Sequence, residues 1–281
     1  MMIRHPNDPL HRVLLPLLLI IMVAPLAHAD MLISPTRGML SDKNRSETLT
    51  LRNTSDGPRT YRLSWEDKRA VGVARYEPIE EGESWNSAAD LIRFSPRQIT
   101  VGPGENQTVR LSYRPPEDLA PGEYRSHLRL QVISEESEPT GEMNVDVDED
   151  GIGVRIFMQM SFSVPVVVRH EVEPPAVSIT DVEVLPAEEN RSRRLAVTLE
   201  RKGEASSYGR LLVEMQRDAD SPVEVIGRVG QLSIFHEQDQ QRVRVPLRDE
   251  NIPAGAWVRV VYEGQEEYSD RVWDERVFQS E

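Results

Sequence analysis

Apolar and polar residues alternate along most of this chain after about residue 30. The clearest case is Val154–Val168, VRIFMQMSFSVPVVV, in which apolar residues occupy every second position from Val154 to Val164. Alternation with a period of two predicts an extended strand with one apolar face. The pattern leaves open whether that face fills the protein's own core or is kept for a partner protein.

Many other stretches alternate in the same way, and turn signals separate them. Residues 66–90 are polar and are expected to be irregular, and no stretch of twelve or more residues has a helical period. Short strands with frequent turns are typical of β-sandwiches. We therefore predict an all-β protein with two antiparallel sandwiches in tandem. The predicted strands of the first half are 31–40 and 92–101, each interrupted by a proline, with 47–52, 60–65, 107–113 and 123–133. Those of the second half are 177–185, 193–201, 208–217, 223–235, 241–247, 256–263 and 269–278.

The first 29 residues are predicted to be a cleaved secretory signal peptide. The apolar run 13–27 is too short and too broken by proline to cross a membrane. Arg4 and Arg12 precede it, and Ala27-His28-Ala29 provides a cleavage signal. We expect an exported, soluble protein with an N-terminal domain over 30–171 and a C-terminal domain over 172–281. Glu173-Pro174-Pro175 is the expected linker.

The formal net charge of -14 and the absence of cysteine narrow the classes of partner and of site. Such an acidic chain is not expected to bind nucleic acid or to insert into a membrane. Acidic residues are concentrated in 134–150, which predicts a solvated loop. Asp146–Gly151 resembles the start of a calcium loop, but Phe157 stands where the bidentate glutamate would be. No catalytic or phosphate-binding motif occurs, so we expect no enzyme activity, no metal and no cofactor.

Several stretches of the first half resemble the periplasmic pilus-assembly chaperones of the chaperone–usher pathway. These stretches are ISPTR at 33–37, TLTLRN at 48–53, FSPRQITVGPGENQTVR at 94–110, GEYRSHL at 122–128 and FSVPV at 162–166. The resemblance implies two immunoglobulin-like domains and a periplasmic chaperone for pilus or fimbrial subunits. The partners that it implies are pilin-like subunits and an outer-membrane usher.

The resemblance also gives the alternating strand a role. In this family the last strand of the N-terminal domain is donated to a subunit that lacks one strand of its own sandwich. Strand addition combines backbone hydrogen bonds with side chains that fill pockets, and flexible Met side chains suit varied grooves. The strand edge is also expected to allow self-association. The donor residues here would be Val154, Ile156, Met158, Met160 and Phe162.

A basic pair that holds the subunit's terminal carboxylate is the family's second feature. Arg37 falls at the position of the first-strand arginine and can grip a carboxylate bidentately. The lysine of the last strand is missing, because Ser163, or Ser161 in a shifted register, occupies its place. Arg155 and Arg169 are the nearest basic residues and are the candidates for the second group. This departure implies a divergent member of the family.

A second hypothesis is a secreted two-domain β-sandwich that serves as a binding or structural module of the cell envelope without strand donation. In that case the apolar row of the Val154–Val164 strand would be the protein's own core. Polar substitution of Met158 and Phe162 would then unfold the protein. In a strand donor the same substitutions would abolish subunit binding and leave the fold intact.

Overall fold

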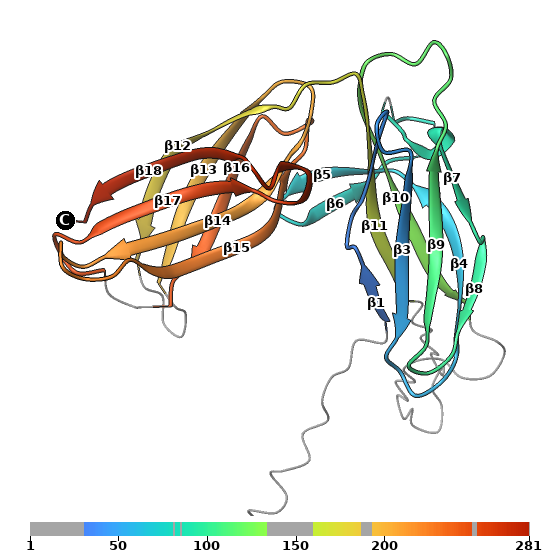
Figure 1. The fold of residues 1–281 in the computed structure, drawn as a ribbon, viewed down its shortest axis with the longest axis horizontal. Coiled ribbons are helices and arrows are strands. Elements are labelled where there is room, and N and C mark those ends of the chain that lie inside the picture. The colour runs from blue at the N-terminus through green and yellow to red at the C-terminus, as the bar shows by residue number, and fades with distance from the viewer. Residues whose placement is uncertain are drawn as a thin grey trace, which may run out of the picture.

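The computed structural model describes residues 31–80, 82–84, 86–133, 160–186, 193–248 and 252–280, which form two β-sandwiches. In Figure 1 the strands of the C-terminal sandwich run crosswise to those of the N-terminal one. The N-terminal strands are β1 (Met31–Ser34), β2 (Gly38–Ser41), β3 (Ser46–Asn53), β4 (Arg59–Glu66), β7 (Ile92–Ser95), β8 (Gln98–Val101), β9 (Asn106–Tyr113), β10 (Gly122–Ile133) and β11 (Ser161–His170), with the 3-10 helix η1 (Ala89–Leu91) before β7.

The N-terminal sandwich contains a four-stranded sheet, β1-β3-β9-β7, and a five-stranded sheet, β2-β11-β10-β4-β8. Two of the passages from one sheet to the other occur at a proline, between β1 and β2 at Pro35 and between β7 and β8 at Pro96. Proline cannot donate to a β-ladder, which accounts for the break at each crossing. Each proline-interrupted strand predicted from the sequence is therefore two strands in different sheets.

Alternate residues of the two sheets meet in a single N-terminal core. Leu49, Leu111, Leu128 and Val166 are fully buried in it, as expected for the inner faces of a sandwich. The hydroxyl of Tyr124 donates a hydrogen bond to the carbonyl oxygen of Ala120 (2.7 Å). A tyrosine that bonds back to the chain just before its strand is a hallmark of immunoglobulin-like sandwiches.

The C-terminal sandwich has its own core, which shares no residue with the first. Its sheets have the orders β12-β13-β16 and β15-β14-β17-β18. The strands begin and end within three residues of the predicted positions, and the predicted fold class is confirmed. They are β12 (Ala176–Leu185), β13 (Arg194–Lys202), β14 (Ser207–Gln216), β15 (Glu224–Ile234), β16 (Gln240–Pro246), β17 (Trp257–Gly264) and β18 (Val272–Gln279), with the 3-10 turn η2 (Glu266–Tyr268) between β17 and β18.

A hairpin of β5 (Lys68–Gly72) and β6 (Arg75–Pro78) forms where the sequence predicted irregular structure, so that prediction was wrong. The hairpin lies between the two sandwiches (Figure 1). The backbone N–H of Ala70 donates to Oε1 of Glu237 in the C-terminal sandwich (2.9 Å). The ring of Tyr76 packs at a tilt against that of Phe235, with 6.0 Å between the ring centroids. The order of the hairpin thus depends on contacts with a distant part of the chain.

Candidate functional site

Strand β11 has an open edge over its first half. It pairs with β10 from Ser161 to His170, whereas β2 pairs with its other edge only from Val166 to Arg169. Among the described residues, no strand pairs with the edge of Ser161–Pro165. Backbone N–H and C=O groups on such an edge form a template for another strand.

The predicted donor row changes its environment along β11. Met160 is 41% exposed, whereas Val164 is buried in the N-terminal core. Phe162 is half-buried and packs against that core, with its ring centroid 6.3 Å from that of Tyr61. Val154, Ile156 and Met158 lie outside the described residues. The described end of the row is therefore core at Val164 and exposed at Met160, with Phe162 between.

Ser163, one of the two serines at the position where the resemblance predicts a lysine, lies beside a lysine from another strand. Oγ of Ser163 accepts a hydrogen bond from Nζ of Lys68 (2.9 Å) and donates one to Oε1 of Glu66 (2.8 Å). Lys68 and Glu66 also form an ion pair (2.6 Å). Lys68 was not predicted to belong to the site, because it lies in the stretch that was expected to be irregular. The scarcity of lysine in the chain was the one signal that could have drawn attention to it.

Arg37 lies in the turn between β1 and β2 and is 4% exposed. Its Nη2 donates to Oε1 of Glu267 (2.7 Å) and to Sδ of Met39 (3.5 Å). Its Cζ lies 4.2 Å from the ring centroid of Tyr208, so the cation also stacks on an aromatic face. Nε and Nη1 are buried and have no hydrogen-bond partner among the described residues.

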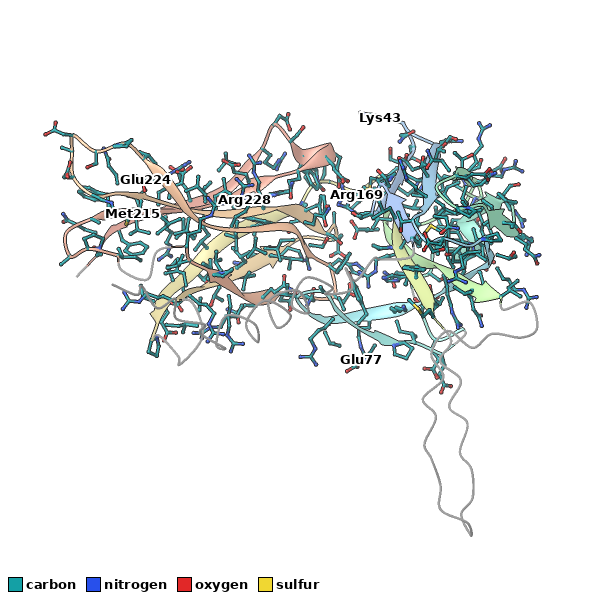
Figure 2. The ribbon with its side chains drawn as sticks, turned by 90° about the horizontal axis from the view of Figure 1, so that it is seen from below. Lys43, Glu77, Arg169, Met215, Glu224 and Arg228 are labelled. Atoms are coloured by element: carbon teal, nitrogen blue, oxygen red, sulfur yellow. The ribbon has the colours of Figure 1, made fainter. Side chains whose placement is uncertain are left out.

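Arg169, one of the two candidates for the second cation, uses all three of its guanidinium nitrogens within the protein. Nε donates to Glu123 (3.0 Å), Nη1 to Glu267 (3.0 Å) and Nη2 to the carbonyl oxygen of Ser206 (2.9 Å). Its Cζ lies 4.7 Å from the ring centroid of Tyr268. Figure 2 shows Arg169 at the junction of the two sandwiches. The other candidate, Arg155, lies outside the described residues.

Glu123 is the buried carboxylate at the centre of this junction. Burial alone would raise its pKa, but the nearby His236 ring, the charge of Arg169 and hydrogen bonds from Ser206 lower the pKa to about 2. Conversely, burial would lower the pKa of Arg169, but the Glu123 carboxylate raises it. A buried ion pair with complete hydrogen bonding favours one geometry, here the geometry between the two domains.

A second polar cluster joins the hairpin to the C-terminal sandwich. Arg125 forms an ion pair with Glu237, donates to the carbonyl oxygen of Lys68 (2.9 Å) and stacks 3.9 Å from the centroid of Phe235. His127 is 1% exposed beneath the hairpin, and neither of its ring nitrogens has a hydrogen-bond partner among the described residues. Burial and the charges of Arg125 and Lys68 lower the pKa of His127 to about 3, so this ring is neutral near pH 7.

A cleft of about 440 Å³ opens between the domains beside Arg169. Acidic and apolar side chains mix in its wall, and burial raises the pKa of one of them, Glu266. The cleft is therefore suited to a peptide segment rather than to a purely apolar ligand. Its lining residues are Met39, Ser41, Asn44, Glu47, Arg169, Val172, Pro174, Glu266, Glu267 and Tyr268.

The described residues contain no group of three or more His, Asp or Glu side chains with a geometry suited to a metal ion. Within the described part of the chain, no helix is long and apolar enough to cross a membrane. The acidic segment Asp146–Gly151 and the predicted signal peptide lie outside the described residues.

Comparisons with known proteins describe the same architecture. A family model of an Fn3-like domain matches residues 38–143, and no curated protein matches the sequence. Among solved structures, the chain is similar to pilus chaperones and to chaperone–subunit complexes.

Three solved structures illustrate the likeness. The CupB2 chaperone of Pseudomonas aeruginosa is 13% identical, with 89% of this chain and 100% of that chain covered and a TM-score of 0.44. The CsuC–CsuE chaperone–tip subunit pre-assembly complex of Acinetobacter baumannii is 12% identical, with 90% of this chain and 98% of that chain covered and a TM-score of 0.41. The SafA pilin–SafB chaperone complex of Salmonella enterica is 10% identical, with 91% of this chain and 98% of that chain covered and a TM-score of 0.40.

Proposed function

We propose that this chain is a periplasmic chaperone that binds pilus or fimbrial subunits, donates a strand edge to their incomplete sandwich and delivers them to an outer-membrane usher. The observation that carries the proposal is the open edge of β11 at Ser161–Pro165. The motifs of the N-terminal half that resemble pilus-assembly chaperones supply the class of partner. The role requires binding and release but no bond chemistry.

Affinity would come from two sources along one strand. The backbone groups of Ser161–Pro165 that no described strand pairs would continue the five-stranded sheet into the subunit, and the apolar row up to Met160 would fill subunit pockets. Met160 is already 41% exposed, so it can enter a partner's groove without leaving the protein's own core. The proposed donor residues remain Val154, Ile156, Met158, Met160 and Phe162, with the last shared between the row and the core.

The position of Arg37 gives a direction to the added strand. Gly38, the next residue, begins β2, which runs parallel to β11 and pairs with it from Val166 onward. A strand added along Ser161–Pro165 would therefore meet Arg37 where β2 starts. If its carboxyl terminus lies at Arg37, the strand runs in the same direction as β11. Lys68, at Ser163, supplies a second cation near the path.

Substitution of Met160 by Asp tests strand donation. A charge in an apolar groove is strongly unfavourable, so co-purification of a co-expressed pilus subunit, chosen from genes beside this one, should be lost while the chaperone stays folded by circular dichroism. Leu32→Asp is the matched control, because Leu32 is 54% exposed on β1, at the edge of the other sheet. Unchanged subunit recovery by Met160→Asp would rule out this role of the edge.

A specific observation favours the second hypothesis, an envelope binding or structural module without strand donation. Phe162 packs against the protein's own core and the ring of Tyr61, as the end of an internal row would. Under this hypothesis Met160→Asp leaves partner binding unchanged. Phe162→Asp is expected to destabilise the N-terminal domain under both hypotheses, so Met160 is the residue that separates them.

A further inference from the structure

The strongest unexplained feature of the junction is the way Glu267 holds Arg37. Glu267 lies in the C-terminal domain, 230 residues from Arg37 in sequence, and its Oε1 accepts from Arg37 Nη2 at 2.7 Å. Met39 Sδ accepts from the same nitrogen. The two hydrogens of Nη2 therefore have two acceptors within the protein, while Nε and Nη1 have none among the described residues.

We propose that Glu267 is an internal placeholder, which occupies Arg37 in the free protein and is displaced by the carboxyl terminus of a bound subunit. This inference rests on the function proposed above and concerns the regulation of the same site. Under this proposal, the Glu267 carboxylate pairs with Arg37 before subunit capture, and the subunit's terminal carboxylate pairs with Arg37 afterwards.

The shape of the guanidinium group supports an exchange. A carboxylate can bind it bidentately in two ways, end-on through Nη1 and Nη2 or side-on through Nε and Nη2. Both ways require Nη2, the nitrogen that Glu267 and Met39 hold. Nε and Nη1 remain as the second donors for an incoming carboxylate. An external carboxylate can thus gain two hydrogen bonds in place of the single bond to Glu267.

The surroundings of Glu267 make its release easier than that of the other carboxylates at the junction. It belongs to η2, a turn of three residues, its side chain is 22% exposed, and it lines the cleft between the domains. Arg169 would also lose a contact with Glu267, but it would keep Glu123 and the carbonyl oxygen of Ser206. Arg37 is therefore the one buried cation of the pair that would need a new partner.

The test uses N-acetylglycine as the smallest mimic of a peptide carboxyl terminus and N-acetylglycinamide as its uncharged control. Each is titrated into the full mature chain, and binding is followed by NMR at the Nε–Hε signal of Arg37. Glu267→Gln should bind N-acetylglycine about tenfold more tightly than the wild type, because removing a competing carboxylate leaves a buried charge without its partner. The amide should bind neither protein.

Glu263→Gln is the matched control, because Glu263 pairs with Arg210 on the same domain and away from Arg37. It should bind N-acetylglycine as the wild type does. If Glu267→Gln does not give a folded spectrum, Glu267→Asp replaces it. Aspartate is one methylene shorter, which weakens the contact with Arg37, and an intermediate gain in affinity is then expected.

The outcomes separate this inference from the proposed function. A gain in Glu267→Gln that disappears when Arg37→Gln is added supports the placeholder. Equal affinity in the wild type and Glu267→Gln, lost in Arg37→Gln, overturns the placeholder and leaves the carboxylate anchor standing. Absence of N-acetylglycine binding in every variant overturns both the anchor and the placeholder, whereas strand donation is tested separately at Met160.

Discussion

Replacement of Glu123 by Gln should expose how strongly the domain junction depends on one buried carboxylate. The side chain of Glu123 has no exposed surface, and it accepts from Arg169 Nε (3.0 Å) and from the backbone N–H of Ser206 (2.9 Å). Gln keeps the shape but removes the charge. Arg169 would then be a buried cation without its main partner.

The magnitude follows from the pKa. The pKa of Glu123 falls from its ordinary value of 4.5 to about 2 in the folded protein, which corresponds to a stabilisation on the order of 3 kcal/mol when the group is charged. Breaking a buried ion pair by removing one partner typically costs about 3–5 kcal/mol. Glu123→Gln should therefore lower the free energy of unfolding by roughly 3 kcal/mol at pH 7.

The sign of the pH dependence is fixed by the direction of the shift. Because the pKa of Glu123 is lower in the folded protein than in the unfolded chain, the contribution is complete above pH 4.5 and is lost as the pH falls to about 2. Urea denaturation followed by circular dichroism, from pH 7 down to pH 2.5, measures the effect. The difference between the wild type and Glu123→Gln should be constant above about pH 5 and shrink below it.

A matched control is Glu263→Gln, which removes a more exposed carboxylate paired with Arg210. It should cost less than about 1 kcal/mol. The reasoning is refuted if Glu123→Gln costs no more than this control. It is also refuted if the cost of Glu123→Gln is the same at pH 3 as at pH 7.

Two further predictions concern the packing that positions the site. Leu128 is fully buried on β10 beside the donor strand, and Leu128→Ala should lower the free energy of unfolding by about 2–5 kcal/mol. Leu32→Ala, at a 54% exposed position, should change it by less than about 0.5 kcal/mol. Equal losses for the two variants in urea denaturation would contradict the assigned core. Gly264→Ala would place a Cβ 1.9 Å from the carbonyl oxygen of Tyr268 and must displace the turn that carries Glu267. We therefore expect a lower melting temperature and a shifted NMR signal of Arg37 Nε–Hε. Gly57→Ala is the control, because its Cβ would meet nothing within 4 Å, and it should change neither quantity.

Local patterns were sufficient to predict most strands, because alternation depends only on which side of a strand faces the core. The seven strands of the C-terminal sandwich lie where period-two patterns placed them. The hairpin Lys68–Pro78 was missed because local alternation was the basis of the prediction. Its sequence has no strong alternation, and its order comes from contacts with Phe235 and Glu237, more than 150 residues away.

The charged part of the site was only partly predictable. The resemblance singled out Arg37, and the structure buries it at the junction. Its partner Glu267 and the placement of Lys68 against Ser163 depend on separations of 230 and 95 residues. No spacing along the chain encodes such pairs, since they arise only when two sheets or two domains are brought together.

Whether the alternating apolar row packs in the protein's own core or contacts a partner depends on where the sandwich ends. A period-two pattern carries no information about where the sandwich ends. Val164, Phe162 and Met160 share one face of the strand, yet their environments run from buried through half-buried to 41% exposed. On the neighbouring strand, β10 ends at Ile133, one residue after the contact between Val132 N–H and the carbonyl oxygen of Met160 (3.2 Å). The same row can therefore belong to the core at one end and serve a partner at the other, and the two hypotheses for its function meet at Phe162.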